Sequence, residues 1–327
     1  MITRKLGDSN IDLSVIGLGT WAIGGSGWDY GWGIQDDKDS IDTILKALEL
    51  GINWIDTAPI YGLGHSEIIV GKALKMRDKE KIFISTKCGL IGDDSGHVSQ
   101  YLKKESIVQE LDASLKRLNI ERIDLYQIHW PNPVNEIFEA FETLNELKQK
   151  GKIRYAGVSN FSVKQMDAIK KAGKISFLQT PYSIINRRIE NEIIDYCAQN
   201  KMGIVSYSPM QCGLLTEKAS LDWIKSLKED DWRKTKSSFF KEPQVNFTLD
   251  LNKKLKAFAE SRGYSISNLA ISWILRKNEI TSVIAGARKP IQIEETVKSS
   301  KWILTNEDIT EIDFYLAEYT NHLKTLS

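Results

Sequence analysis

Ile52-Asn-Trp-Ile-Asp56-Thr-Ala-Pro-Ile-Tyr61-Gly-Leu-Gly-His-Ser-Glu67 is the segment from which the architecture of this chain can be worked out. It predicts a short apolar strand that stops at the carboxylate of Asp56, followed by a glycine-rich turn that carries the phenol of Tyr61. Ser66 then opens a segment with helical apolar spacing. Ligands of α/β proteins lie at the carboxyl ends of the strands, so this pair favours a site that handles protons. The alternative is that Asp56 only caps the turn and that Tyr61 only packs.

The same succession of apolar strand and amphipathic helix recurs along the chain and predicts a parallel sheet covered by helices. Eight such units favour a closed (β/α)8 TIM barrel, for which about 250 residues plus insertions are typical. An open doubly wound sheet is the alternative, but Gly17-Leu-Gly19-Thr-Trp-Ala22 lacks the third glycine of the GxGxxG phosphate fingerprint. The expected strands are 15–20, 52–56, 82–87, 123–129, 153–158, 177–180, 203–207 and 282–284, and the expected helices are 37–50, 66–75, 104–118, 135–150, 162–173, 189–200, 250–262, 265–277 and 290–299.

No break in composition divides the chain, so we expect a single domain over residues 1–327. Residues 3–15 predict an amino-terminal β-hairpin. Residues 216–248 depart from the strand–helix succession and hold two tryptophans among many charges. Long segments of this kind on compact barrels are often functional, and we expect a partly helical lid.

The composition excludes several classes of function. Of the 327 residues, 42% are hydrophobic, which is enough for a large core. Lys and Arg number 44 and Asp and Glu 43, so the net charge of +1 gives no general attraction to nucleic acid or membrane lipid. The cysteines, Cys88, Cys197 and Cys212, have neither disulfide nor metal-ligand spacing. With no signal peptide and no apolar run long enough for a membrane span, we expect a cytoplasmic protein without a metal ion, and the sequence indicates no oligomeric state.

Reactive side chains are expected together at neighbouring strand ends. Asp56, Lys87 and His129 are the last residues of three successive expected strands, and Tyr61 follows the first of them. All four side chains would then face one mouth of the barrel. The alternative is a buried Asp56–Lys87 ion pair that only holds the barrel together, but the cost of desolvation makes such a pair a poor source of stability.

At these residues the sequence resembles the aldo-keto reductase family, and the resemblance covers essentially the whole chain. It implies the barrel fold, a catalytic tetrad of Asp56, Tyr61, Lys87 and His129, and NADPH or NADP+ bound across the barrel mouth. It also implies an enzyme that reduces a small-molecule carbonyl substrate, an aldehyde or ketone, to the alcohol. The motifs that carry the resemblance are Asp56-Thr-Ala with Tyr61-Gly, Ser85-Thr-Lys87, Ser114-Leu-Lys-Arg-Leu118 with Asp124-Leu-Tyr and His129, Gly151-Lys-Ile-Arg-Tyr-Ala-Gly-Val-Ser-Asn160, Tyr207-Ser-Pro with Gly213-Leu-Leu, and Gly286-Ala-Arg288.

The chemistry of carbonyl reduction agrees with these residue types. Reduction needs a hydride for the carbon and a proton for the oxygen, and an isolated tyrosine with a pKa of about 10 is a slow acid at neutral pH. We expect the ammonium of Lys87 to lower the pKa of Tyr61, and Asp56 to keep Lys87 charged. His129 would donate a hydrogen bond to the carbonyl oxygen.

The resemblance further implies the residues that bind the nicotinamide end and the pyrophosphate. Ser159, Asn160 and Gln179 match positions that hold the carboxamide, for which amide side chains supply both a donor and an acceptor. Tyr207 matches the position whose ring stacks on the nicotinamide. The alternative is ordinary hydrogen bonding and packing at strand ends. The other residues expected in this part of the groove are Gly19, Thr20, Trp21, Asp56, Ser208, Pro209, Met210, Cys212, Gly213 and Leu214.

The adenosine end is expected between the last strand and its helix, where a helix amino terminus with a nearby arginine suits a phosphate. The resemblance places the 2′-phosphate at Arg288, with Gln292 beside it, Glu295 towards the adenine and Gly286 at the strand end. This assignment favours NADPH over NADH. The chain departs from the family pattern at Thr296, where asparagine is common, and at Ala285, where proline is common.

The substrate is expected against an aromatic wall made of Trp21, Trp32 and Trp130, which suits aromatic or modest aliphatic aldehydes. Two other functions remain open. Some relatives with the same tetrad serve as regulatory subunits of potassium channels and bind the cofactor there. The same site can also run in reverse, as an NAD(P)-dependent sugar dehydrogenase.

Overall fold

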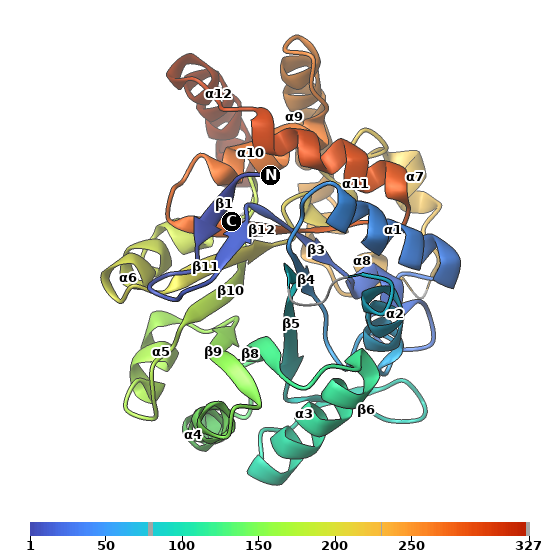
Figure 1. The fold of residues 1–327 in the computed structure, drawn as a ribbon. Coiled ribbons are helices and arrows are strands. Elements are labelled where there is room, and N and C mark those ends of the chain that lie inside the picture. The colour runs from blue at the N-terminus through green and yellow to red at the C-terminus, as the bar shows by residue number, and fades with distance from the viewer. Residues whose placement is uncertain (78–80, 230, 325–327) are drawn as a thin grey trace.

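Within the residues that the computed structural model describes, 1–77, 81–229 and 231–324, eight parallel strands form a closed barrel. The ring is closed because the last strand pairs with the first, with Gly286 opposite Gly19. The predicted (β/α)8 barrel is therefore confirmed, and the open sheet is ruled out (Figure 1). In the order of the ring the strands are β3 (Ile16–Gly19), β4 (Trp54–Asp56), β5 (Phe83–Cys88), β8 (Ile123–Ile128), β9 (Ile153–Ser159), β10 (Phe177–Pro181), β11 (Gly203–Tyr207) and β12 (Ile280–Gly286).

Helices surround the barrel and shield its outer face. Their starts follow local sequence signals: the carboxylate of Asp36 accepts from the amide of Asp39, and Ser162 with Gln165 forms the expected capping box. The helices that follow the eight strands are α1 (Asp37–Glu49), α2 (His65–Leu74), α3 (Lys104–Leu118), α4 (Ile137–Gln149), α5 (Val163–Ile169), α6 (Ile193–Gln199), α10 (Ile266–Leu275) and α11 (Pro290–Thr296).

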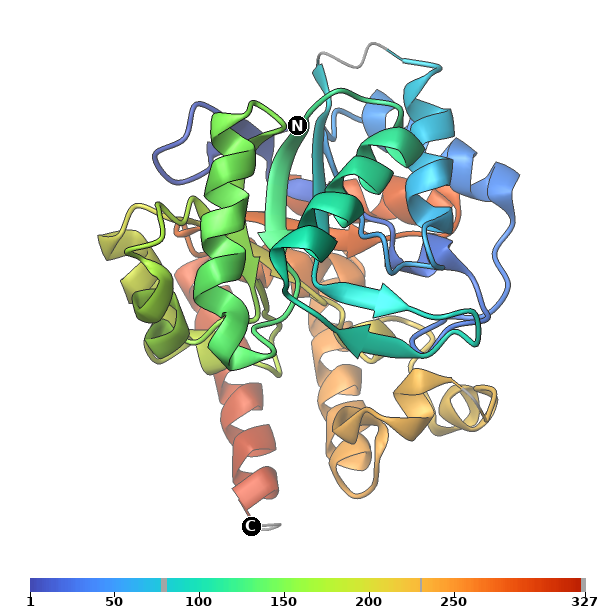
Figure 2. The ribbon, with the colours of Figure 1, turned by 90° about the horizontal axis from the view of Figure 1, so that it is seen from below.

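Two further long helices lie side by side and cross the outside of the barrel. α9 (Gln244–Glu260) begins six residues before the predicted 250, and α12 (Asn306–Lys324) was not predicted. Their contact includes a hydrogen bond between the hydroxyls of Thr248 and Tyr319. Figure 2 shows both helices extending beyond the barrel in the same direction.

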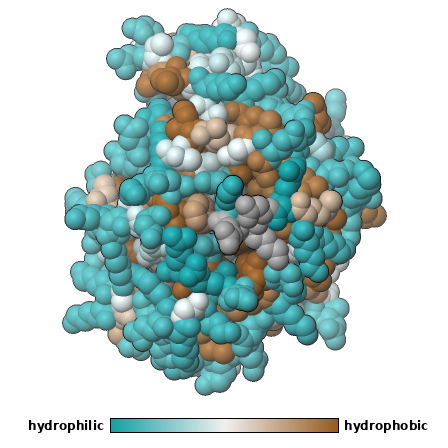
Figure 3. All heavy atoms as spheres, viewed as in Figure 1, coloured by the Kyte–Doolittle hydropathy of each residue, from teal (hydrophilic) through white to brown (hydrophobic). Residues whose placement is uncertain are grey.

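The amino-terminal hairpin, β1 (Thr3–Lys5) with β2 (Asp12–Ser14), closes one end of the barrel, where Figure 1 shows it across the ring of strands. Leu6, Ile11 and Leu13 are buried against side chains that point into the barrel, among them Trp54 and Phe177. Burying each such side chain contributes roughly 1.5–3 kcal/mol. The outer face at this end is mostly hydrophilic, with scattered apolar residues (Figure 3).

The opposite end carries the long loops. A short hairpin of β6 (Leu90–Gly92) and β7 (Val98–Gln100), which the sequence pattern did not predict, follows β5. The segment expected as a lid, described except for residue 230, is partly helical, with α7 (Leu221–Lys225) and α8 (Trp232–Thr235). In Figure 2 it lies at the end of the barrel away from the hairpin. No helix among the described residues has the length and apolarity needed to cross a bilayer.

Candidate active site

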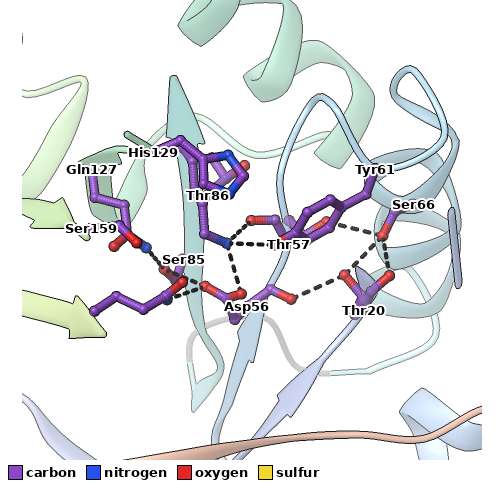
Figure 4. Close-up of polar contacts among 12 residues, drawn as sticks. Thr20, Asp56, Thr57, Tyr61, Ser66, Ser85, Thr86, Gln127, His129 and Ser159 are labelled. Atoms are coloured by element: carbon purple, nitrogen blue, oxygen red, sulfur yellow. Dashed lines mark hydrogen bonds and ion pairs between the residues drawn. The ribbon is translucent and has the colours of Figure 1, made fainter. Parts of the chain in front are cut away.

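Asp56, Tyr61, Lys87 and His129 meet at the carboxyl ends of β4, β5 and β8. The ammonium of Lys87 lies 2.7 Å from Oδ2 of Asp56 and donates to the phenol oxygen of Tyr61 at 3.2 Å. The ring of His129 meets that of Tyr61 edge-on, with 5.9 Å between ring centroids. Figure 4 shows Asp56, Tyr61 and His129 gathered around one point. The predicted juxtaposition is therefore present, although His129 follows the last residue of β8 by one position.

Asp56 is buried, and both of its carboxylate oxygens have donors. Oδ1 accepts from Ser85 at 3.2 Å and from the amide of Gln179 at 2.8 Å, while Oδ2 accepts from Lys87. Gln127, one strand further, donates to the hydroxyl of Ser85. These contacts fix the carboxylate that in turn aims the ammonium of Lys87, which also donates to the carbonyl of Thr57.

The loop that carries Tyr61 is held by a small network of hydroxyls. Ser66, at the start of α2, contacts the hydroxyl of Thr57 and donates to the carbonyl oxygen and hydroxyl of Thr20. Thr20 in turn donates to the carbonyl of Asp56. The network, drawn in Figure 4, ties the ends of β3 and β4 to α2. Thr20 was predicted to line the cofactor groove, and in this structure its hydroxyl supports the catalytic loop.

Burial shifts the pKa values of Tyr61, Lys87 and His129. Burial, together with the charge of Asp56, raises the pKa of Tyr61 well above its ordinary value. The expected net lowering of this pKa is not found, because desolvation of the phenol outweighs the effect of an ammonium that is already paired with Asp56. Burial also lowers the pKa of Lys87, and burial with the nearby Lys87 charge lowers that of His129 well below the ordinary range. Tyr61 is consequently protonated, and His129 neutral, at neutral pH.

The residues predicted to hold the nicotinamide carboxamide contact one another. The amide of Asn160 donates to the carbonyl of His129 and to Ser159, and it accepts from the hydroxyl of Tyr207. Gln179 donates to Asp56, as described above. These side chains thus surround the strand ends beside the tetrad, where the prediction placed them.

The loop after β11 has a strained backbone. Ser208, Gln211 and Cys212 have φ angles of 56°, 44° and 56°, in the left-handed region that residues other than glycine seldom occupy. Such strain tends to collect at ligand sites, where the surrounding structure enforces it. The predicted pyrophosphate path, Ser208 to Leu214, coincides with this loop. Burial raises the pKa of Cys212 to about 11, so its thiol is protonated and unreactive at neutral pH.

Arg288 joins the loops that follow the first and the last barrel strands. Its guanidinium donates to the side chain of Gln35 at 2.5 Å and to the carbonyl of Ile34. Gln292 accepts from the amide of Arg288 at 2.7 Å, whereas Glu295 pairs with Lys298. Within the described chain Arg288 contacts no carboxylate, so its positive charge is not neutralised by the protein.

Two of the three tryptophans predicted for the substrate wall, Trp21 and Trp32, contact each other near Tyr61. The ring of Trp21 stacks on Tyr61 with 6.3 Å between centroids, and it meets Trp32 edge-on at 5.6 Å. Trp232 from the lid stacks on Trp21 at 5.1 Å, and this contact was not predicted. Trp130, 39% exposed, is without a ring contact among the described residues. The two tryptophans in the lid sequence were the only signal for Trp232.

Sequence reasoning gave no role to two carboxyl groups behind β5, one of them fully buried and the other partly buried. Glu67 is fully buried and bonds to the hydroxyl of Thr86 and to Arg117, each at 2.7 Å. Glu110 accepts from the amide of Gly89 and from Ser106. In the sequence, Glu67 belongs to the motif Ser66-Glu67 with Gly71 that also carries the family resemblance, whereas Glu110 has only the pattern of an ordinary helical glutamate.

The fold is thus a closed parallel barrel that brings four ionisable side chains together at its strand ends. A family model described as the Aldo/keto reductase family matches residues 15–316. Aldo-keto reductase YhdN of Bacillus subtilis is 40% identical over 314 residues, which cover 95% of this chain and 92% of that protein. The NADH-specific methylglyoxal reductase of Escherichia coli is 36% identical over 318 residues, covering 93% of this chain and 95% of that one.

Among solved structures, the glycerol dehydrogenase of Gluconobacter oxydans matches with a TM-score of 0.87 at 38% identity, covering 97% of this chain and 95% of that one. The holo form of an aldo-keto reductase from Bacillus halodurans matches with a TM-score of 0.78 at 28% identity, covering 96% of each chain. The chain belongs to the aldo/keto reductase family. This is a family of oxidoreductases that use nicotinamide cofactors and small carbonyl substrates.

Proposed function

We propose that this protein reduces aldehydes and ketones to alcohols with NADPH, and that Tyr61 is the general acid. The observation that carries the proposal is the 3.2 Å contact between Lys87 and the phenol oxygen of Tyr61, beside the ring of His129. When bound, the cofactor supplies the hydride for the carbonyl carbon. The raised pKa keeps the proton on Tyr61 at neutral pH, and its transfer then depends on a neighbour that stabilises the phenolate.

The other members of the tetrad support this transfer. The ammonium of Lys87 stabilises the phenolate that Tyr61 becomes after it gives up its proton. Asp56 keeps Lys87 charged against the cost of burial. Neutral His129 donates one ring N–H to the carbonyl oxygen and orients it without competing as an acid.

The preference for NADPH rests on Arg288. Its charge, left without a carboxylate partner in the described residues, fits a 2′-phosphate near the start of α11. The strained loop after β11 fits the pyrophosphate. The Escherichia coli relative is named as NADH-specific, so both cofactors belong in every assay.

The reverse reaction, oxidation of a sugar or polyol, is a second candidate because the similar solved structure is named a glycerol dehydrogenase. Oxidation needs Tyr61 as a base, in its phenolate form. The raised pKa makes that form scarce at neutral pH, which favours reduction.

The test is an assay of the purified protein in both directions, with NADPH and NADH, on 4-nitrobenzaldehyde and a panel of aldoses and polyols. We expect Tyr61→Phe to lower kcat for reduction roughly 10²- to 10⁴-fold, the usual contribution of a general acid. NADPH binding, followed by fluorescence, should be unchanged. Tyr30→Phe, which removes another phenol near the mouth, is the matched control and should retain activity.

Near-wild-type rates in Tyr61→Phe would remove this residue as the acid. If the wild-type protein binds cofactor but reduces nothing in the panel, a regulatory role replaces the enzymatic one. Faster oxidation of polyols than reduction of aldoses at neutral pH would favour the dehydrogenase.

A further inference from the structure

A glutamine side chain lies inside the barrel, on the strand next to the one that carries Lys87. Gln127 of β8 is fully buried and is paired in register with Lys87 of β5. Its amide nitrogen donates to the hydroxyl of Ser85 at 3.1 Å, whereas its amide oxygen has no hydrogen-bond partner among the described residues. Gln127 is therefore a buried polar group of which only one half is satisfied.

The stability of the barrel does not account for this amide. A buried acceptor without a donor typically costs more free energy than one neutral hydrogen bond contributes. An apolar side chain of similar length, such as methionine, would fill the same space without that cost. The one hydrogen bond that Gln127 does make is therefore the best indication of its role.

That hydrogen bond sets the direction in which Ser85 donates. A hydroxyl has a single hydrogen, and Ser85 gives it to Oδ1 of Asp56 at 3.2 Å. The amide of Gln127 approaches the same hydroxyl as a donor, so the hydrogen of Ser85 is left to the carboxylate. With the opposite orientation of the amide, Ser85 would donate to Gln127, and Asp56 would lose a donor. Figure 4 shows the three side chains joined in this order.

We propose that Gln127 is a positioning residue for catalysis, which acts through Ser85 on the carboxylate of Asp56 and so on the ammonium of Lys87. Each donor in such a chain polarises the next bond, so loss of the amide weakens the bond from Ser85 to Asp56. Ser85 donates to no other acceptor among the described residues, whereas Gln179, the second donor to Oδ1, is also proposed to hold the cofactor. The inference rests on the proposed function, in which Lys87 stabilises the phenolate.

The test is a double-mutant cycle with Gln127→Met and Ser85→Ala, in which kcat for 4-nitrobenzaldehyde is measured. Each single variant should lower kcat about three- to tenfold, the effect of one hydrogen bond. The double variant should be no slower than Ser85→Ala, because Gln127 acts only through that hydroxyl. The dissociation constant of NADPH should change less than about twofold. The urea midpoint of Gln127→Met should not fall, because the change also removes the unsatisfied oxygen.

Two further variants separate positioning from packing. Gln127→Glu restores a donor at about pH 5.5, because burial keeps the new carboxyl protonated and its O–H can replace the amide N–H. At that pH it should turn over faster than Gln127→Met. Tyr126→Phe is the matched control, since this neighbour on β8 is equally buried but donates to the carbonyl of Ile107, outside the barrel. It should leave kcat unchanged even if it lowers stability.

Additive losses in the cycle, or wild-type kcat in Gln127→Met, would overturn the inference and leave the proposed function intact. A Gln127→Met variant that loses stability would overturn it as well, since the amide would then be a structural group. A wild-type protein that reduces no aldehyde would instead remove the proposed function, and this inference with it. A non-additive loss of kcat at unchanged stability supports both.

Discussion

At the scale of single residues, the burial of the Glu110 carboxyl makes the stability of the folded protein depend on pH. Its carboxyl holds the amide of Gly89, two residues after Lys87, and the adjacent Cys88 carbonyl accepts from the amide of His129. Desolvation raises the pKa of Glu110 to about 7, against about 4.3 in an unfolded chain. Because the folded state holds this proton more tightly, the contribution of Glu110 to stability is fully present below about pH 4 and is lost as the pH rises through about 7.

We predict that Glu110→Gln removes this contribution. The amide mimics the neutral carboxyl, so the variant should gain stability relative to wild type as the pH rises from 5 to 8, by about 3 kcal/mol or less. Urea unfolding at several pH values measures it. Glu105→Gln, on the exposed side of the same helix, is the control and should follow wild type. Parallel curves for wild type and Glu110→Gln would show that Glu110 does not titrate in this range.

At the scale of secondary-structure elements, an ion pair fastens α2 and α3 behind β5. Arg117 pairs with the fully buried Glu67, which also bonds to Thr86 on the strand. The two helices approach so closely that a Cβ at Gly71 would lie 2.4 Å from the carbonyl oxygen of Arg117. The end of β5 that carries Lys87 is therefore held in place by the Arg117–Glu67 ion pair behind it.

We predict that Arg117→Met destabilises the protein by about 3–5 kcal/mol, because it leaves the buried Glu67 carboxylate without its partner. The control is Lys170→Met, which breaks the exposed pair with Asp167 and should cost less than about 1 kcal/mol. Denaturant unfolding of both variants at neutral pH gives the comparison. A loss in Arg117→Met as small as in the control would mean that Glu67 is neutral in the folded protein.

The same scale shows what the sequence can and cannot predict. Periodicity finds the eight strand–helix units because each buries one continuous apolar face. It passes over α12, although Ile312, Leu316 and Tyr319 have readable helical spacing, because that helix lies outside the repeated succession. The tetrad can be predicted because Asp56, Lys87 and His129 end successive expected strands, whose carboxyl ends meet at one face of the barrel. The stacking of Trp232 on Trp21 and the raised pKa of Tyr61 depend on side chains that are far apart in the sequence and exclude water together. Local sequence patterns therefore could not predict them.

At the scale of the whole molecule, Arg288 connects the first and last strand–helix units through Gln35. We predict that Arg288→Ala raises the dissociation constant of NADPH about tenfold or more, the usual value of a hydrogen-bonded charge, and that of NADH less than threefold. Lys289→Ala, next to it and exposed, is the control. Cofactor titrations followed by fluorescence provide the measurement, and equal weakening for the two cofactors would refute a role in phosphate binding.

The amino-terminal hairpin closes one end of the barrel. Leu6, Ile11 and Leu13 are buried in one cluster with Trp54 at this end, so we expect water to reach the site from the loop-bearing end. If Tyr61 is the acid, as we propose, each turnover leaves it one proton short, and the replacement proton has to enter at the loop-bearing end. Release of the alcohol and reprotonation of Tyr61 would then share one opening, because the amino-terminal hairpin closes the other end.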